Sequence, residues 1–182
     1  MFSYKIDDDA ELRLIEPRHA GELNALVMQN YEHIREWSAW LTEKERPIER
    51  TQEWIGQNLE RFARNEGFTI GIWYKGAIVG QIDFGNVNWN DRKFEIGYWL
   101  GASFQGKGLV TKSCRALINH AFDELKFNRV EMRCAVENKK SRRIPEKLGF
   151  REEGILREAG WLHDHFVDEV IYGLLASEWE QR

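Results

Sequence analysis

The sequence contains little cysteine and no long apolar run. Its two cysteines, Cys114 and Cys134, form no CxxC or CxxH pattern, so the spacing predicts neither a disulfide framework nor a zinc site. No apolar run approaches the ~20 residues that a membrane-spanning helix needs. The start, MFSYKIDDDA, is acidic where a signal peptide would be basic and then apolar. We therefore expect a cytoplasmic protein with buried thiols and no membrane partner.

The sequence also lacks a basic excess, internal repeats and a linker. Lys and Arg total 26 against 30 Asp and Glu, a net charge of −4. Because nucleic-acid binding needs a clustered basic face, this balance argues against direct nucleic-acid binding. The 182 residues have no low-complexity segment or Pro/Gly-rich stretch, which favours a single domain over 1–182.

Aromatic residues are abundant, at 13% with eight tryptophans, and serve either a core or a cleft.

Residue periodicity predicts helices over 17–28, 30–41 and 47–65 after a first strand at 11–17. Strands at 68–74 and 77–85 flank Lys75-Gly76, which indicates a β-hairpin. The predicted elements that follow are a strand at 93–100, a helix at 108–125, a strand at 128–136, a helix at 141–149 and strands at 150–156 and 164–175. This order favours an α/β sandwich around a mixed sheet over repeated βαβ winding.

The stretch GASFQGKGLVTK, residues 101–112, matches most of a nucleotide-binding P-loop. Gly108 occupies the position where that loop needs a Ser or Thr hydroxyl for Mg²⁺. A predicted β-meander also precedes it, instead of an early strand of a wound parallel sheet. The NTPase interpretation is therefore disfavoured, and a plain glycine-rich turn remains an alternative. Two glycines before a helix start nevertheless suit an anion, because first-turn N–H groups point outward with about half a unit of positive charge.

The same loop resembles the R/Q-x-x-G-x-G/A signature of the GNAT superfamily, with Gln105 and Gly108 in place and Val110 departing at the last position. The resemblance is to the Rim-type branch of ribosomal-protein N-acetyltransferases. It runs through REWSAWL, EIGYWL, FQGKGLVTK, NRVEMRCAVENKKSRRIPEKLGF and EGILRE with DHFVDEVIYGLLASEW. It implies an α/β (α+β) fold with a mixed, mostly antiparallel central sheet, flanking helices and splayed central strands.

The resemblance also implies acetyl-CoA as cosubstrate, without a metal. The residues that it places on coenzyme A are Tyr98, Trp99, Leu100, Gln105, Gly106, Lys107, Gly108, Leu109, Val110, Thr111, Asn138 and Ser141. The loop would hold the pyrophosphate, and the backbone of Tyr98 to Leu100 would pair with pantetheine. Helix capping is the simpler account of Asn138 and Ser141.

Glu95 and Ser141 are the candidate catalytic residues. Glu95 lies two residues before Gly97, and an interior strand glycine often marks a bulge. The resemblance implies a bulge there that opens a slot for pantetheine, with Glu95 as general base. A salt-bridged strand residue is the alternative. Many GNAT members carry a Tyr acid where this chain has Pro145, so Ser141 becomes the hydrogen-bond donor to the leaving thiolate.

Two further groups of residues have competing interpretations. Trp37, Trp40 and Trp54 would border the acceptor groove in the resemblance, whereas a Trp stripe at helical spacing is more often core. His163, Asp164, His165 and Asp168 could suggest a metal, but no third ligand is convincingly spaced. We therefore predict no metal site.

The predicted activity is direct acetyl transfer from acetyl-CoA to an amine. An α-amine is roughly a fifth to a third neutral at pH 7.4 and a lysine amine only about 0.1%, so an N-terminal acceptor asks less of the base. The predicted acceptor is a protein or peptide α-amine, with a ribosomal-protein N terminus suggested by the resemblance. The alternatives are a small amine (polyamine, amino sugar or drug) and a non-catalytic CoA-binding module. The partners would be this acceptor and, in a homodimer, a second copy of the chain.

Overall fold

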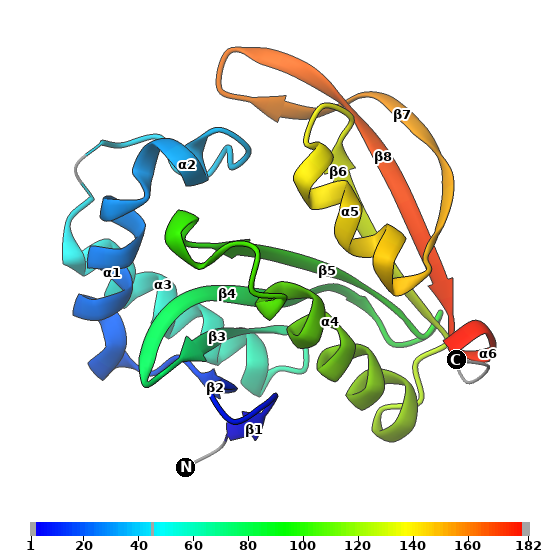
Figure 1. Cartoon of the computed structure of the whole chain (residues 1–182), viewed down its shortest axis with the longest axis horizontal. Helices are drawn as coiled ribbons and strands as arrows, with labels where there is room; N and C mark the ends of the chain where they lie inside the picture. Colours follow the sequence, from blue (N-terminus) through cyan, green and yellow to red (C-terminus); the bar gives the residue numbers. More distant parts are fainter. Residues whose placement is uncertain (1–2, 45, 180–182) are drawn as a thin grey trace.

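One eight-stranded sheet runs through residues 3–44 and 46–179, the part of the chain that the computed structural model describes. Its spatial order is β1-β2-β3-β4-β5-β6-β8-β7 (Figure 1). The strands are β1 (Ser3–Lys5), β2 (Ala10–Leu14), β3 (Phe68–Tyr74), β4 (Ala77–Asn88), β5 (Lys93–Leu100), β6 (Arg129–Ala135), β7 (Arg151–Leu162) and β8 (His165–Leu175). Neighbouring strands are antiparallel except β5 and β6, which are parallel. The predicted mixed, mostly antiparallel α/β fold is confirmed.

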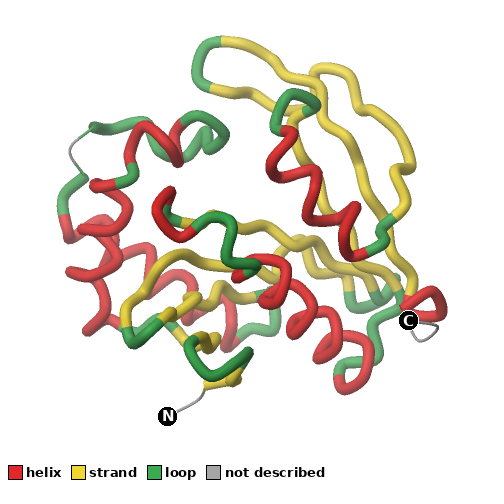
Figure 2. The backbone as a smooth tube through the Cα atoms, viewed as in Figure 1, coloured by secondary structure: helices red, strands yellow, loops and turns green. Residues whose placement is uncertain are grey.

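Helices cover both faces of this sheet (Figure 2). The helices are α1 (Ala20–Gln29), α2 (Tyr31–Arg35), α3 (Ile48–Ala63), α4 (Leu109–Asn119), α5 (Lys139–Leu148) and α6 (Ala176–Trp179). Successive strand residues point to opposite faces, so the sheet supports two cores. On β3, Ile72 packs in the core beneath α4 and α5, while Trp73 packs in the core beneath α1 and α3.

The β3–β4 hairpin follows from its turn dipeptide. Tyr74 pairs with Ala77, and between them Lys75 and Gly76 both have positive φ, at 52° and 83°. Two residues with positive φ make the type I′ turn that matches strand twist. The predicted hairpin is confirmed.

The sheet divides between β5 and β6. These strands pair at only three positions, Lys93↔Arg129, Phe94↔Val130 and Glu95↔Glu131. Beyond them β5 stays on β4 as far as Leu100, and β6 stays on β8 as far as Ala135. The two parts of the sheet therefore meet at one end and spread apart toward the other (Figure 1). The predicted splay of the central strands is confirmed.

The bulge lies elsewhere than predicted. The β4–β5 register is continuous from Gly80↔Leu100 to Gly85↔Glu95, so it does not shift at Gly97. The register shifts between Gly85 and Asn88 of β4, where Asn86 has a φ of 47°. The extra residue is accommodated on β4 because Asn tolerates the left-handed region.

Several predicted elements have different bounds. Of the helix predicted over 30–41, only α2 is helical. The amides of Trp37 and Ser38 donate to carbonyls three residues back, those of Ile34 and Arg35, instead of the four residues back of an α-helix. The helix predicted over 17–28 begins as a 3₁₀ turn, Pro17–His19, before α1. Strand β7 is longer than its predicted 150–156. Of the described helices, none has the length and hydropathy of a membrane span.

Candidate active site

A cavity of about 920 Å³ lies where β5 and β6 diverge. Its walls come from Ile96 to Leu100 of β5 and Met132 to Ala135 of β6. The cavity is completed by the start of α4, one side of α5, the segment after α2 and the β7–β8 hairpin. Beyond Glu95 the edge of β5 that would pair with β6 therefore faces the cavity. His163 at the hairpin tip contacts the Arg35 carbonyl with its Nε2, 2.7 Å away, and so ties the tip to α2.

The glycine loop lines one end of this cavity. Gly106 and Gly108 adopt φ of 77° and 75°, a region that favours glycine. Gly108 is the N-cap of α4, and its carbonyl accepts the amide of Lys112 at 3.0 Å. The first N–H groups of a helix have no intrahelical partner, so those at the start of α4 can receive an anion. A side chain at Gly106 would project into open space, which leaves room beside the loop. This main chain fits a diphosphate.

Four cations from α5 also line the cavity, and the sequence analysis missed them: Lys139, Lys140, Arg143 and Lys147. Two of them are in the first turn of α5, which contains no acidic residue. Positive charge at a helix N terminus opposes the helix dipole, so this placement is unfavourable unless an anion is bound nearby. In the run NKKSRR, positive charges stand at a helix start, where they are unfavourable unless an anion is bound. This pattern is the signal in the sequence from which these residues could have been predicted.

Asn138, Ser141 and Tyr98 meet on the cavity wall. Asn138 is the N-cap of α5, and its Oδ1 accepts the Ser141 amide at 3.1 Å. The Tyr98 hydroxyl donates to the Ser141 carbonyl at 3.0 Å. Burial raises the pKa of Tyr98 well above its ordinary value, so this hydroxyl remains a donor. Ser141 is thus held through its backbone on both sides, and the capping expected of Asn138 is present.

Most of the predicted CoA-binding residues line the cavity together. They are Tyr98, Trp99, Leu100, Gln105, Gly106, Gly108, Leu109, Val110, Thr111, Asn138 and Ser141. Lys107 is not among the described lining residues; its Nζ lies 5.9 Å from the centre of the Tyr74 ring. Its ammonium group lies over the ring of Tyr74, a residue of β3.

Glu95 is not one of the described residues that line the cavity either. Its Oε2 accepts a hydrogen bond from Asn86 Nδ2 at 2.8 Å and lies 3.7 Å from Arg133 Nε. These contacts come from the β4 bulge and from β6. Such a salt-bridged position is the alternative to a catalytic one that the sequence leaves open.

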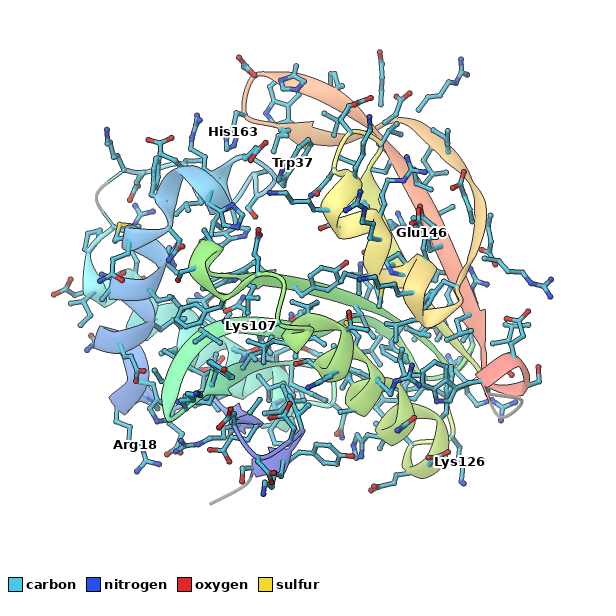
Figure 3. All side chains as sticks on the ribbon, viewed as in Figure 1. Arg18, Trp37, Lys107, Lys126, Glu146 and His163 are labelled. Carbon is cyan, nitrogen blue, oxygen red and sulfur yellow. The ribbon has the colours of Figure 1, made fainter. Side chains whose placement is uncertain are left out.

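The three tryptophans of the predicted acceptor groove are separated. Trp37 lines the cavity and lies near His163, between α2 and the hairpin (Figure 3). Trp40 is 48% exposed and stacks with Arg46, whose guanidinium carbon is 5.6 Å from the ring centre. Trp54 packs against the core beneath α1 and α3. Trp37 and Trp40 diverge because the chain leaves the helix after Arg35, which removes their predicted shared face, whereas Trp54 lies on the separate helix α3.

Two other candidate groups have structural explanations. Cys134 lines the cavity, and burial raises the pKa of its thiol to about 12. His165 and Asp164, at the hairpin tip, bond each other at 2.7 Å. Within residues 3–44 and 46–179, no group of three or more His, Cys, Asp or Glu side chains is placed to hold a metal ion.

Comparison with known proteins identifies the family. The model of the acetyltransferase (GNAT) domain matches residues 10–151. The chain belongs to the GNAT acetyltransferase family. It is 39% identical over 181 residues to the Bacillus subtilis protein named "Putative ribosomal N-acetyltransferase YdaF", covering 99% of this chain and 98% of that one. It is 27% identical to the ribosomal-protein-serine acetyltransferase of Escherichia coli K12, over 92% of this chain and 93% of that one.

A solved acetyltransferase structure supports the same reaction. The microcin C7 self-immunity acetyltransferase MccE, in complex with acetyl-CoA and AMP, superposes with a TM-score of 0.90 at 32% identity, over 94% of each chain. The protein is accordingly an N-acetyltransferase that uses acetyl-CoA. The loop that partly matches a P-loop thus belongs to a GNAT domain and not to an NTPase.

Proposed function

We propose that the acceptor is the α-amine of a protein or peptide, with a ribosomal-protein N terminus as the leading class. The enzyme would act in the cytoplasm. The observation that carries this proposal is the set of carboxylates and aromatic side chains that line the cavity in addition to the α5 cations. Carboxylates from Glu36, Glu137 and Glu169 line the cavity together with the apolar side chains of Trp37 and Trp161. Carboxylates favour an ammonium group, and aromatic walls suit the first side chains of a peptide. The ribosomal acetyltransferase names of two relatives support the same class.

Coenzyme A would lie along α4 and α5 in this proposal. Main-chain amides from Gly106 to Thr111 would receive the diphosphate, and the α5 cations would face its remaining phosphate. The unpaired edge of β5 from Tyr98 to Leu100 would pair with the pantetheine amides, as an added strand does. Asn138 and Ser141 line the cavity beside Tyr98, where the thioester would lie.

Transfer would be direct, from the thioester to the amine. Cys134 is a cavity thiol that could form an acyl-enzyme, but a thiol with a pKa of about 12 carries almost no thiolate at neutral pH. The Ser141 hydroxyl would donate a hydrogen bond to the departing thiolate. Ser141→Ala should therefore lower kcat about 10-fold while the dissociation constant for CoA, measured by calorimetry, changes little. An unchanged kcat would remove this role.

A small amine is the second candidate acceptor, and the MccE relative, solved with AMP beside acetyl-CoA, favours amines attached to a nucleotide. The deciding experiment follows thiol release with acetyl-CoA and a panel of acceptors. The panel contains short peptides with free N termini, the same peptides with blocked N termini and a free lysine, polyamines, amino sugars and aminoacyl nucleotides. Turnover confined to free N termini supports the proposal. Turnover confined to the small amines overturns it.

A further inference from the structure

We propose that Glu169 of β8 is the catalytic base that accepts the proton of the attacking amine. Glu169 pairs with Ala135, the last residue of β6, and directly paired residues of neighbouring strands share a face. Both residues line the cavity. Glu169 therefore presents a carboxylate from the strand next to the divergence, beside the α5 start that holds Asn138 and Ser141.

The other carboxylates near the site are less suited to this task. Glu36 and Glu137 line the cavity but are exposed, so water solvates them as it would a free carboxylate. Glu95 lies outside the described lining and is engaged by Asn86 and Arg133. Glu169 combines contact with the cavity and partial burial.

The surroundings of Glu169 make its carboxylate more basic than usual. Burial is the main cause of its raised pKa, and the negative charge of Glu95 on β5 adds to the effect. The guanidinium of Arg133 on β6 acts in the opposite direction and lowers the pKa. On the β7 side the carboxylate faces Gly160, which has no side chain. A carboxylate with a raised pKa is a stronger base.

Gly160 supplies the space that this carboxylate occupies. A Cβ atom at Gly160 would lie 2.9 Å from Glu169 Oε1 and 3.0 Å from Val167 Cγ2. The first contact is closer than normal packing allows, and the second is tighter than most real contacts of a Cβ atom. A glycine at this position of β7 therefore lets Glu169 turn toward the cavity, and any larger residue would displace it.

The proposed step balances as follows. The amine nitrogen attacks the carbonyl carbon of the thioester, and a C–N bond forms. Glu169 takes one proton from that nitrogen, the C–S bond breaks and its electron pair leaves on sulfur. The CoA thiolate then takes up a proton, and Glu169 releases its own to solvent. This inference rests on the acetyl-transfer reaction and holds for whichever amine the acceptor panel identifies.

The test is Glu169→Gln, which keeps size and hydrogen bonding but cannot accept the proton. We expect kcat/KM to fall by about 10²-fold or more, the range of general-base contributions. The wild-type pH profile should contain an acid limb above the ordinary Glu value of 4.5, distinct from the limb of the acceptor α-amine near 7.7–8.0. The variant should keep the amine limb and lose the lower one. Calorimetry should give the same CoA affinity for both proteins.

Three further measurements test the assignment of Glu169 as the base. Protein labelled with ¹³C at Glu carboxyls should show one resonance, absent from Glu169→Gln, that titrates above the ordinary range without any substrate. Gly160→Ala should lower kcat/KM while CoA affinity is kept, because the added methyl displaces the carboxylate. Asp168→Asn is the matched control on the same strand. Asp168 Oδ1 accepts a hydrogen bond of 2.8 Å from the Glu158 amide, and the Asn side chain can still accept it. The rate of acetyl transfer should therefore be unchanged in this variant.

Comparison with Glu95→Gln decides which carboxylate is the base. The inference is overturned if Glu95→Gln removes the lower acid limb and Glu169→Gln retains it, or if Glu169→Gln transfers at the wild-type rate. A parallel loss of CoA affinity in Glu169→Gln would assign the residue a structural role and also overturn it. Failure of wild-type protein to acetylate any peptide, with transfer to small amines intact, would instead remove only the acceptor proposal.

Discussion

The Tyr98 hydroxyl reaches the Ser141 carbonyl at 3.0 Å, joining β5 to the start of α5 next to the point where the sheet divides. Beyond Glu95 the two strands no longer share a ladder, so side chains must set the width of the gap. Tyr98 does this and also fixes the backbone of the residue proposed to face the thiolate.

Tyr98→Phe keeps the ring and removes this donor. We expect a loss of about 1 kcal/mol in unfolding free energy, because the partly buried Ser141 carbonyl loses its partner, and a several-fold fall in kcat as Ser141 shifts. Chemical denaturation and steady-state kinetics measure the two effects. Tyr172→Phe is the control. The Tyr172 hydroxyl accepts a hydrogen bond of 2.9 Å from Arg142 Nε, and neither residue is among the described residues that line the cavity. This variant should therefore lose stability with little change in kcat. Equal kinetic effects in the two variants would contradict the role of Tyr98.

Gly108→Ala tests the anion cradle. A left-handed conformation costs a non-glycine residue about 1–2 kcal/mol, so the variant should either lose stability or rearrange the N terminus of α4. In both cases the CoA dissociation constant, measured by calorimetry, should rise. Gly76→Ala is matched to it, with a φ of 83° and open space around its added Cβ, but lies in the β3–β4 turn. Its CoA affinity should equal that of the wild type, and a loss there would show that strain alone explains both variants.

The α5 cations should make CoA binding depend on salt. Arg143→Ala should weaken CoA by about 3- to 10-fold at low ionic strength, and the difference from the wild type should shrink at high salt because exposed charges are screened. Lys44→Ala removes the same charge from an exposed residue that does not line the cavity, and should leave the affinity unchanged. A salt-independent affinity would exclude a part for these cations.

Cys134 allows a prediction about pH. Its pKa is raised from 9.0 to about 12 by burial, so the unfolded chain ionises this thiol before the folded protein does. The stabilisation is present below pH 9 and is lost as the pH rises through the interval from 9 to 12. Thermal melts should therefore show a steeper loss of stability above pH 9 in the wild type than in Cys134→Ala. Parallel melting curves would contradict the raised pKa.

The same residue should not carry the acetyl group. Incubation with acetyl-CoA without an acceptor should leave the intact mass of the protein unchanged, since a protonated thiol is a weak nucleophile. Cys134→Ala should still transfer acetyl to the acceptor. An acetylated wild-type protein whose modification disappears in Cys134→Ala would replace direct transfer by a two-step reaction.

The sequence by itself determined the features that depend on a few neighbouring residues. The Lys75-Gly76 turn, strand β5 and the helix start at Gly108 were predicted correctly, because turn chemistry and side-chain alternation act within a few residues. The resemblance carried by EIGYW, QGKG and KLGF likewise gave the family and the splayed sheet.

Tertiary structure alone decided which carboxylate and which tryptophan of the predicted acceptor groove reach the cavity. Glu95 and Glu169 are both strand carboxylates, and the residues beside them do not show which one reaches the cavity. Pairing with Ala135 and the space at Gly160 bring Glu169 to the cavity, while the β4 bulge brings Asn86 to Glu95. These contacts join segments far apart in the sequence, and the register of strand pairing selects them. The position of Trp37 was decided in the same way, by the end of α2 and the packing of the hairpin tip on Arg35.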